Sequence, residues 1–153
     1  MDVMLRTFTK LAVVVSAVVA ASLASAELKW HTKYEDALAE AKKTKKVILA
    51  DFTGSDWCGW CIKLKKEVFN TPEFEKWAKA NVVLLELDFP QKKKQPAAIE
   101  KQNEKLAEKY KIEGFPTILF MDATGKEVAR YGYDSGGPAN WTKKAEAMIK
   151  KKA

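Results

Sequence analysis

Two cysteines three positions apart are the side chains of this sequence best suited to chemistry. Cys58 and Cys61 are the only cysteines among the 153 residues. A thiolate, not a thiol, attacks a disulfide, and two thiols that can reach each other can exchange a disulfide with another molecule. The spacing therefore indicates a pair that opens and closes reversibly, with a Cys58–Cys61 disulfide as its oxidised form.

The sequence around the cysteines predicts that a strand ends and a helix begins there. An apolar run at 47–50, followed by Phe52, predicts a buried strand, and apolar residues among lysines at 62–69 predict an amphipathic helix. Cys58 would then lie at the helix N-terminus, where unpaired N–H groups and the helix dipole stabilise a thiolate. Cys61 would lie one turn further on the same face, its Cα atom roughly 5–6 Å from that of Cys58, which a disulfide can bridge.

Two other interpretations of the cysteine pair stay open at this point. A structural disulfide is one, although a bridge across so short a loop removes little chain entropy. Half of a zinc site is the other, but zinc requires four ligands, and beyond the cysteines the chain offers a single histidine, His31. We favour a redox-active dithiol that needs neither a metal nor an organic cofactor. His31, at the start of a predicted helix, is expected to be exposed and without a function.

Two motifs give the chain a family resemblance. The run Trp-Cys-Gly-Trp-Cys at 57–61, after a strand that bears Asp51, resembles the active site of thioredoxin-fold proteins. The run Gly-Phe-Pro-Thr at 114–117 resembles the cis-proline loop that faces the dithiol in that family. The resemblance covers most of the chain after residue 30 and implies a cis bond before Pro116. The residues that it implies for substrate binding are Trp57, Gly59, Trp60, Phe115 and Pro116.

Asp51 resembles the buried acid beneath the dithiol of that family, which helps to move protons to and from the second cysteine. The chain has one extra residue between Asp51 and Cys58 compared with compact thioredoxins, and no clear counterpart of the lysine that often pairs with this acid. A hydrogen-bonded residue at the end of a strand is the alternative interpretation. Asp56, in the loop before Cys58, is expected to be an exposed acid.

The resemblance implies a thiol–disulfide oxidoreductase, with protein thiols or disulfides as substrates and a further redox partner that the sequence does not identify. Cys58 is the expected nucleophile, and Cys61 is expected to resolve the mixed disulfide. A thioredoxin-fold binding or chaperone module, in which the dithiol is incidental or regulatory, is the alternative. No motif supports binding to nucleic acid. The net charge of +7 comes mostly from dispersed lysines, which we expect on solvated helix faces.

Residues 1–26 have the pattern of a signal peptide. Basic residues precede an apolar run at 11–23, and Ala-Ser-Ala at 24–26 matches a cleavage site. The run is shorter than the roughly 20 residues that span a membrane, so an uncleaved anchor is the weaker alternative. We expect cleavage after Ala26, which leaves a domain at 27–153 in the periplasm or outside the cell, without a membrane span.

The rest of the chain alternates helices with strands. The predicted helices cover 30–46, 62–69, 71–81, 97–110 and the C-terminal segment around 141–152, and the predicted strands cover 47–52, 82–87, 117–121 and 127–133. Strands joined through helices favour parallel pairing, and the terminal hairpin adds antiparallel strands, which together predict an α/β thioredoxin fold with a mixed central sheet of about four strands and helices on both faces. The lysine-rich segment 89–96 is expected to be a mobile loop, and the helix after it an insertion relative to compact thioredoxins.

Overall fold

A mixed five-stranded sheet is the centre of the computed structural model, which describes residues 28–151. The strands lie in the order β1-β3-β2-β4-β5. They are β1 (Trp30–His31), β2 (Val47–Thr53), β3 (Val82–Asp88), β4 (Thr117–Met121) and β5 (Glu127–Tyr131). The predicted signal peptide at 1–26 and residues 27, 152 and 153 of the predicted domain lie outside the described residues.

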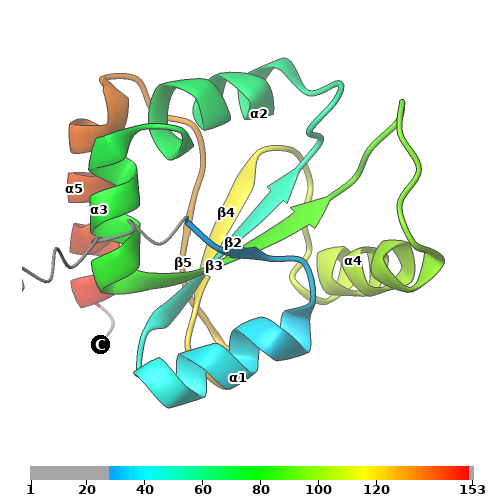
Figure 1. Cartoon of the computed structure of the whole chain (residues 1–153), viewed down its shortest axis with the longest axis horizontal. Coiled ribbons are helices and arrows are strands. Elements are labelled where there is room, and N and C mark those ends of the chain that lie inside the picture. The colour runs from blue at the N-terminus through cyan, green and yellow to red at the C-terminus, as the bar shows by residue number, and fades with distance from the viewer. Residues whose placement is uncertain (1–27, 152–153) are drawn as a thin grey trace, which may run out of the picture.

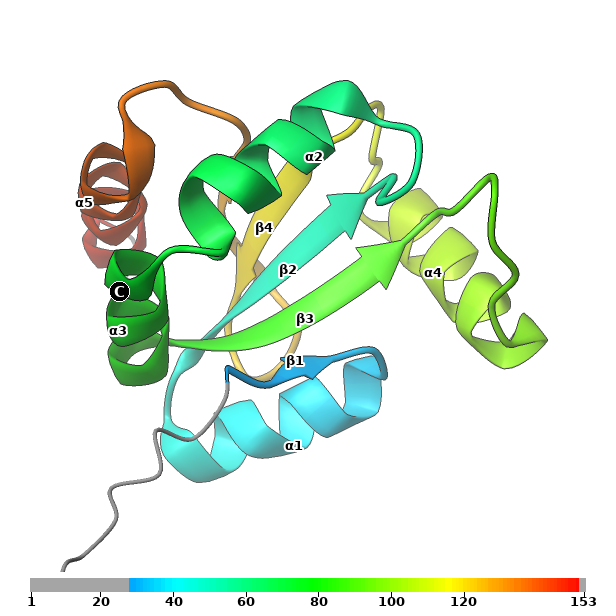
Figure 2. The same ribbon diagram turned by 45° about the horizontal axis from the view of Figure 1, so that its top comes forward.

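Helices cover both faces of the sheet, as predicted (Figures 1 and 2). They are α1 (Tyr34–Thr44), α2 (Gly59–Leu64), the π-helical turn η1 (Lys65–Phe69), α3 (Pro72–Asn81), α4 (Ala97–Lys109) and α5 (Gly137–Lys150). α1 and α4 pack on one face, and α2, η1, α3 and α5 pack on the other. Within residues 28–151 no helix has both the length and the apolar character needed to cross a membrane.

The alternation of side chains along β2 assigns each residue to one of these two layers. Ile48 and Ala50 pack in the core with α1 and α4, whereas Leu49 packs in the core with α2, α3 and α5. Side chains two apart in a strand share a face, so Asp51 points to the α2 side. Both faces are covered by helices, which explains why the central strands are apolar almost throughout.

The pairing of the strands brings three chain segments to one end of the sheet. β2 runs parallel to β3, with Thr53 opposite Asp88, and antiparallel to β4, with Phe52 opposite Thr117. The ends of β2 and β3 and the start of β4 therefore lie together. The connection from β2 to α2, which carries the cysteines, begins at this end.

The sheet has one strand more than predicted, because the chain joins it before the first helix. Trp30 and His31, which the sequence pattern places in that helix, pair with β3 opposite Leu84 and Leu85. α1 begins only after Lys33, which has an extended conformation. A two-residue strand has no periodicity of its own, so the sequence does not reveal it.

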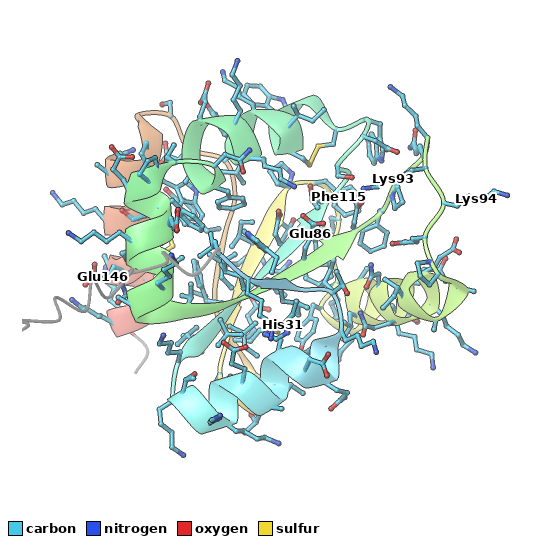
Figure 3. The ribbon with its side chains drawn as sticks, viewed as in Figure 1. His31, Glu86, Lys93, Lys94, Phe115 and Glu146 are labelled. Atoms are coloured by element: carbon cyan, nitrogen blue, oxygen red, sulfur yellow. A yellow bond between two sulfur atoms is a disulfide. The ribbon has the colours of Figure 1, made fainter. Side chains whose placement is uncertain are left out.

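The prediction that His31 is exposed is wrong. Pairing with β3 places its side chain between β1 and α1, where it is buried (Figure 3). Its Nε2 atom lies against the carboxylate of Glu40 in α1. His31 therefore links the first strand to the first helix, far from the cysteines.

Candidate active site

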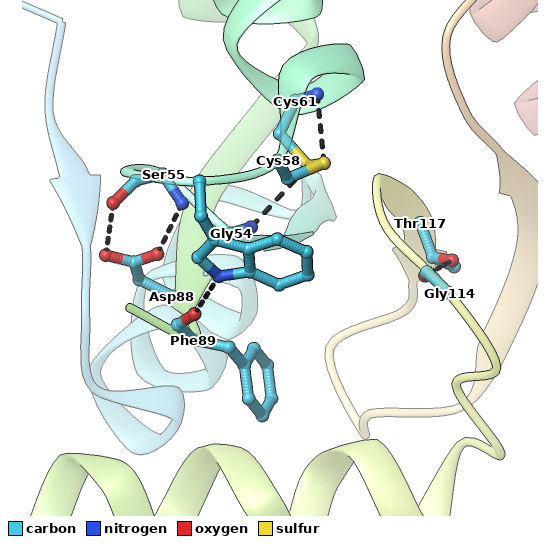
Figure 4. The surroundings of a disulfide bond; sticks show 9 residues. Gly54, Ser55, Cys58, Cys61, Asp88, Phe89, Gly114 and Thr117 are labelled. Carbon is cyan, nitrogen blue, oxygen red and sulfur yellow. Dashed lines mark hydrogen bonds between the residues drawn. A yellow bond between two sulfur atoms is a disulfide. The ribbon is translucent and has the colours of Figure 1, made fainter. Parts of the chain in front are cut away.

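Cys58 and Cys61 form a disulfide at the start of α2, with their Cα atoms 5.3 Å apart (Figure 4). Cys58 is the N-cap of the helix, and its Sγ atom accepts the backbone N–H of Cys61 at 3.2 Å. The N–H of Gly54 donates to the Sγ atom of Cys61 at 3.5 Å. Both sulfurs therefore have a backbone donor, which stabilises negative charge on either of them when the pair is reduced.

A tight turn between β2 and α2 holds the pair in place. The carbonyl of Gly54 accepts the N–H of Trp57 and, at 2.9 Å, that of Cys58. A Cβ atom on residue 54 would lie 2.5 Å from the indole of Trp57, so only glycine allows the ring to close over the turn. The indole Nε1–H in turn donates to the carbonyl of Phe89 at 2.7 Å, which fixes the ring beside Cys58.

Two of the residues expected to bind substrate form an aromatic cluster beside the dithiol. The rings of Trp57 and Phe115 meet edge to face with centroids 5.9 Å apart. Phe89, which the sequence does not single out, joins them at 5.0 Å from Phe115. Trp57 is 38% exposed, so the cluster presents apolar surface to a docking chain.

Trp60, between the two cysteines in the sequence, belongs to a second aromatic pair. It is 58% exposed and its ring centroid lies 5.1 Å from that of Tyr133. The Nζ atom of Lys63 lies 5.2 Å from each centroid, within the range of a cation–π contact. Gly59 has open space where a side chain would be, so its backbone is accessible next to this pair. Neither Tyr133 nor Lys63 has a sequence signal that points to this position.

The loop 114–117 faces the disulfide, and the Phe115–Pro116 bond in it is cis (Figure 4). The hydroxyl of Thr117 donates to the carbonyl of Gly114 at 2.7 Å, which closes the turn. Because Thr117 pairs with Phe52 of β2, the loop is held at the same end of the sheet as the cysteines.

Asp51 is buried on the α2 side of the sheet, beneath Cys61. Its Oδ1 atom has no hydrogen-bond partner among the described residues, so the interpretation as a hydrogen-bonded strand residue lacks support for this atom. Burial and, to a smaller extent, the carboxylate of Glu86 together raise the pKa of Asp51 to about 8, and the charge of Lys65 opposes the change. Asp51 and Cys61 line the same cavity of about 180 Å³. An acid with a pKa near neutrality can both take and return a proton.

Lys65, in η1, is the lysine whose charge acts on Asp51, and the sequence does not single it out. Glu86 is the register partner of Asp51 on β3, and the Nζ atom of Lys65 lies 3.4 Å from its Oε2 atom. Glu86 has a sequence signal, because it is the one charged residue in the apolar run 82–87. Lys65 has none, since it is one of several lysines on an amphipathic helix.

Asp56 is only partly exposed, not fully exposed as expected, because it also binds the lysine-rich segment. Its carboxylate accepts the backbone N–H groups of Gln91, Lys92 and Lys93 at 2.9, 2.8 and 3.0 Å. These hydrogen bonds lower the pKa of Asp56. The expectation of a mobile loop at 89–96 needs correction, because its first half is anchored to the turn before Cys58.

Asp88, at the end of β3, fastens the same turn from below (Figure 4). Its carboxylate accepts the N–H of Ser55 at 2.9 Å and the hydroxyl at 2.6 Å, and it pairs with Lys93 at 3.0 Å. Although burial opposes the change, these contacts lower the pKa of Asp88. Among residues 28–151, no three His, Cys, Asp or Glu side chains are grouped so that they could hold a metal ion.

Comparison with known proteins identifies a domain family and related sequences. The sequence model of a thioredoxin-like domain matches residues 34–146. The chain is 41% identical over 128 residues to the disulfide bond reductase DsbH of Chlamydia pneumoniae. This match covers 84% of this chain and 76% of the relative. It is 35% identical over 103 residues to the thioredoxin-related protein DsbJ of the same organism, a match that spans 67% of this chain but only 30% of DsbJ.

Solved structures agree with these sequence matches. The structure titled DsbH Oxidoreductase superposes with a TM-score of 0.78 at 40% identity, covering 84% of this chain and 89% of the other. A thioredoxin from Thermus thermophilus shares the fold, with a TM-score of 0.60 at 22% identity. The match covers 82% of this chain and 90% of the thioredoxin chain. The chain therefore belongs to the family of thioredoxin-like domains.

Proposed function

We propose that this chain is a thiol–disulfide oxidoreductase that exchanges disulfides with protein substrates through Cys58 and Cys61. The observation that carries the proposal is the disulfide at the N-terminus of α2, opposite the cis-proline loop and above a buried acid. The relatives named disulfide bond reductase and thioredoxin-related protein support it.

In the reduced protein, Cys58 starts the exchange. Its thiolate is stabilised by the N–H of Cys61 and by the start of the helix. The thiolate attacks one sulfur of a partner disulfide, the partner's S–S bond breaks, and a mixed disulfide joins Cys58 to the partner. The partner's other sulfur leaves as a thiolate and takes a proton from water.

Cys61 completes the exchange with the help of Asp51. The thiol of Cys61 gives its proton to the carboxylate of Asp51, and the resulting thiolate attacks the sulfur of Cys58. The mixed disulfide breaks, the partner leaves with both its sulfurs reduced, and the Cys58–Cys61 disulfide remains. Two electrons have passed to the partner, so a dithiol of a further redox partner must reduce the pair before the next turn.

The two aromatic pairs bind the substrate chain next to the dithiol. Trp57 with Phe115 and Trp60 with Tyr133 offer apolar surface to the chain that flanks a partner disulfide. Pro116 and Gly59 leave room for that chain to approach the sulfur, because neither carries a bulky polar side chain. Aromatic surface that is partly exposed in the free protein is common at such docking sites.

The site of action follows from the signal pattern. We place the protein in the periplasm or outside the cell, with residues 1–26 removed and a domain that starts at residue 27. Disulfide chemistry on protein substrates is needed mainly in such oxidising compartments. The intact mass of the exported protein should correspond to Glu27 as the first residue, and retention of Met1–Ala26 in that species would contradict the placement.

Reduction of insulin by dithiothreitol tests the proposed activity. The wild-type protein should accelerate the precipitation of the insulin B chain, and Cys58→Ala should reduce the rate to that of dithiothreitol alone. A binding or chaperone module would leave the rate unchanged or delay precipitation. That result with the wild-type protein would overturn the proposal.

A further inference from the structure

The cavity beneath the disulfide has an ion pair at its solvent side that the mechanism above does not use. Asp51 and Cys61 lie at the buried end of this cavity, and Lys65 and Glu86 also line it. Glu86 lies on β3, next to β2 at the centre of the sheet (Figure 3). The pair therefore stands between the buried acid and water.

The register of the sheet fixes the position of Glu86 relative to Asp51. The two residues are directly paired on parallel strands, and paired residues of neighbouring strands point to the same face. Leu84, two positions before Glu86, packs in the core on the α2 side, which confirms the face. The Glu86 side chain is 24% exposed, so it lies between the buried carboxyl of Asp51 and the solvent.

Lys65 reaches Glu86 from the helix layer. Its Nζ atom lies 3.4 Å from the Oε2 atom of Glu86, and its side chain is 52% exposed. Lys65 is the first residue of the π turn, whose wider hydrogen bond runs from the N–H of Asn70 to the carbonyl of Lys65. π turns inside helices occur frequently at functional sites. An exposed ion pair contributes little to stability, so stability alone does not account for this one.

We propose that the Glu86–Lys65 ion pair controls when Asp51 accepts the proton of Cys61. The inference rests on the proposed function, and it assigns two positioning residues to the step in which the mixed disulfide is resolved. The negative charge of Glu86 disfavours a second negative charge on Asp51, and the positive charge of Lys65 favours it. The two residues therefore act on the same proton in opposite directions.

Among the charged groups around Asp51, Glu86 and Lys65 are the two whose charges act on it most strongly. The titratable or charged groups that face Asp51 are Cys61 from α2, Lys65 and Lys66 from η1, and Glu86 and Asp88 from β3. On the β4 side its register partner is the apolar Ile118. Asp88 is already paired with Lys93 and bonded to Ser55, so its charge is largely compensated. Glu86 raises the pKa of Asp51 more than Asp88 does.

Glu86→Gln and Lys65→Gln test the inference because they should shift one titration in opposite directions. The carboxyl carbon of Asp51 is followed by NMR in the oxidised, isotope-labelled protein from pH 5 to 10. Its midpoint should fall by about half to one pH unit in Glu86→Gln and rise by a similar amount in Lys65→Gln. Glu104→Gln and Lys105→Gln make the same charge changes on exposed positions of α4 and should leave the midpoint in place.

A second measurement connects the titration to the chemistry. Reduced protein is mixed rapidly with a small aromatic disulfide, and the rate at which the second aromatic thiol is released is recorded against pH. The midpoint of this profile should move with the NMR midpoint, downward in Glu86→Gln and upward in Lys65→Gln. Unmoved NMR midpoints, or shifts of the same sign in both variants, would overturn the inference. NMR shifts without matching shifts in the rate profile would also overturn it.

The NMR experiment does not depend on enzymatic activity, so the two proposals can fail separately. If wild-type protein reduces insulin but the midpoints stay in place, the oxidoreductase stands and the control by Glu86 and Lys65 does not. If wild-type protein does not reduce insulin, the proposed function fails whatever the midpoints do, and the inference fails with it. The oxidised protein's NMR spectrum also shows whether each variant keeps the fold.

Discussion

Asp51 and Asp56 lie five positions apart on either side of the same strand end, and their surroundings give them opposite properties. Asp51 is buried, its Oδ1 atom has no partner among the described residues, and its pKa is raised to about 8. Asp56 is partly exposed and accepts three backbone N–H groups, which lower its pKa. Desolvation dominates at the first position and hydrogen bonding to the charged form at the second.

The comparison separates an acid that holds the structure from one that is available for chemistry. The three donors around Asp56 bind the charged carboxylate more strongly than a neutral carboxyl, so its ionisation strengthens the attachment of the segment that begins at Phe89 to the turn before the cysteines. The Oδ1 atom of Asp51 has no such donor within residues 28–151, and this residue lines the same cavity as Cys61. A carboxyl that gains little from ionisation can release and accept a proton near neutral pH.

The largest effect that would test this contrast is on stability. The folded pKa of Asp51 is about 8, and the pKa in the unfolded chain is about 3.9. Between these values the folded protein keeps a proton that the unfolded chain has lost, so the free energy of unfolding falls as the pH rises. Asp51→Asn should remove this fall, which amounts to up to about 5 kcal/mol between pH 4 and 9.

Denaturant unfolding of the two oxidised proteins at several pH values measures this difference. The pH slopes should be compared rather than the stabilities at one pH, because asparagine has its own cost of burial at this position. Asp56→Asn serves as the control, since it should leave the slope between pH 5 and 8 as in the wild type. Parallel pH profiles for wild type and Asp51→Asn would show that Asp51 is ionised in the fold at neutral pH.

The next effect concerns rate. Without the carboxylate of Asp51, the thiol of Cys61 must lose its proton to water, so Asp51→Asn should slow resolution of the mixed disulfide by about 10–100-fold at neutral pH. The first attack by Cys58 should change little. Rapid mixing with a disulfide that releases two coloured thiols separates the two steps. Equal rates of the second step in mutant and wild type would return Asp51 to a structural role.

A smaller, local effect is expected from the other acid. Asp56→Ala removes the acceptor of three N–H groups, so the amides of Gln91, Lys92 and Lys93 should exchange with deuterium faster than in the wild type. Asp122→Ala is the matched control, because Asp122 accepts the N–H groups of 124 and 126 in the β4–β5 turn. It should speed exchange there and leave 91–93 as they are. Unchanged exchange at 91–93 in Asp56→Ala would mean that the anchor does not hold this segment.

The parts of the molecule that the sequence predicts are those with local patterns. Continuous apolar runs and helical periodicity predict the layered α/β fold, and the two motifs at 57–61 and 114–117 predict that these segments meet. The sequence does not predict β1, because two residues are too few to show a periodicity. The burial of His31 is not predicted either, because this burial depends on the pairing of β1 with β3.

The electrostatics of the site depend on contacts between distant segments, which a single sequence does not show. Asp56 and its donors are 35 to 37 positions apart. Glu86 stands out as a charge in an apolar strand, but its role follows only from its pairing with Asp51. Lys65 is one lysine among several until the π turn and the cavity are known.

The central claim is that Cys58 attacks and Cys61 resolves, and trapping of mixed disulfides tests it most directly. Each cysteine is changed to alanine, and the proteins are expressed with residues 1–26 included and compared on non-reducing gels. Cys61→Ala should accumulate higher-mass adducts that collapse to one band with reductant, because the mixed disulfide on Cys58 cannot be resolved. Cys58→Ala should trap nothing. Adducts on Cys58→Ala but not on Cys61→Ala would contradict the account and reverse the two roles.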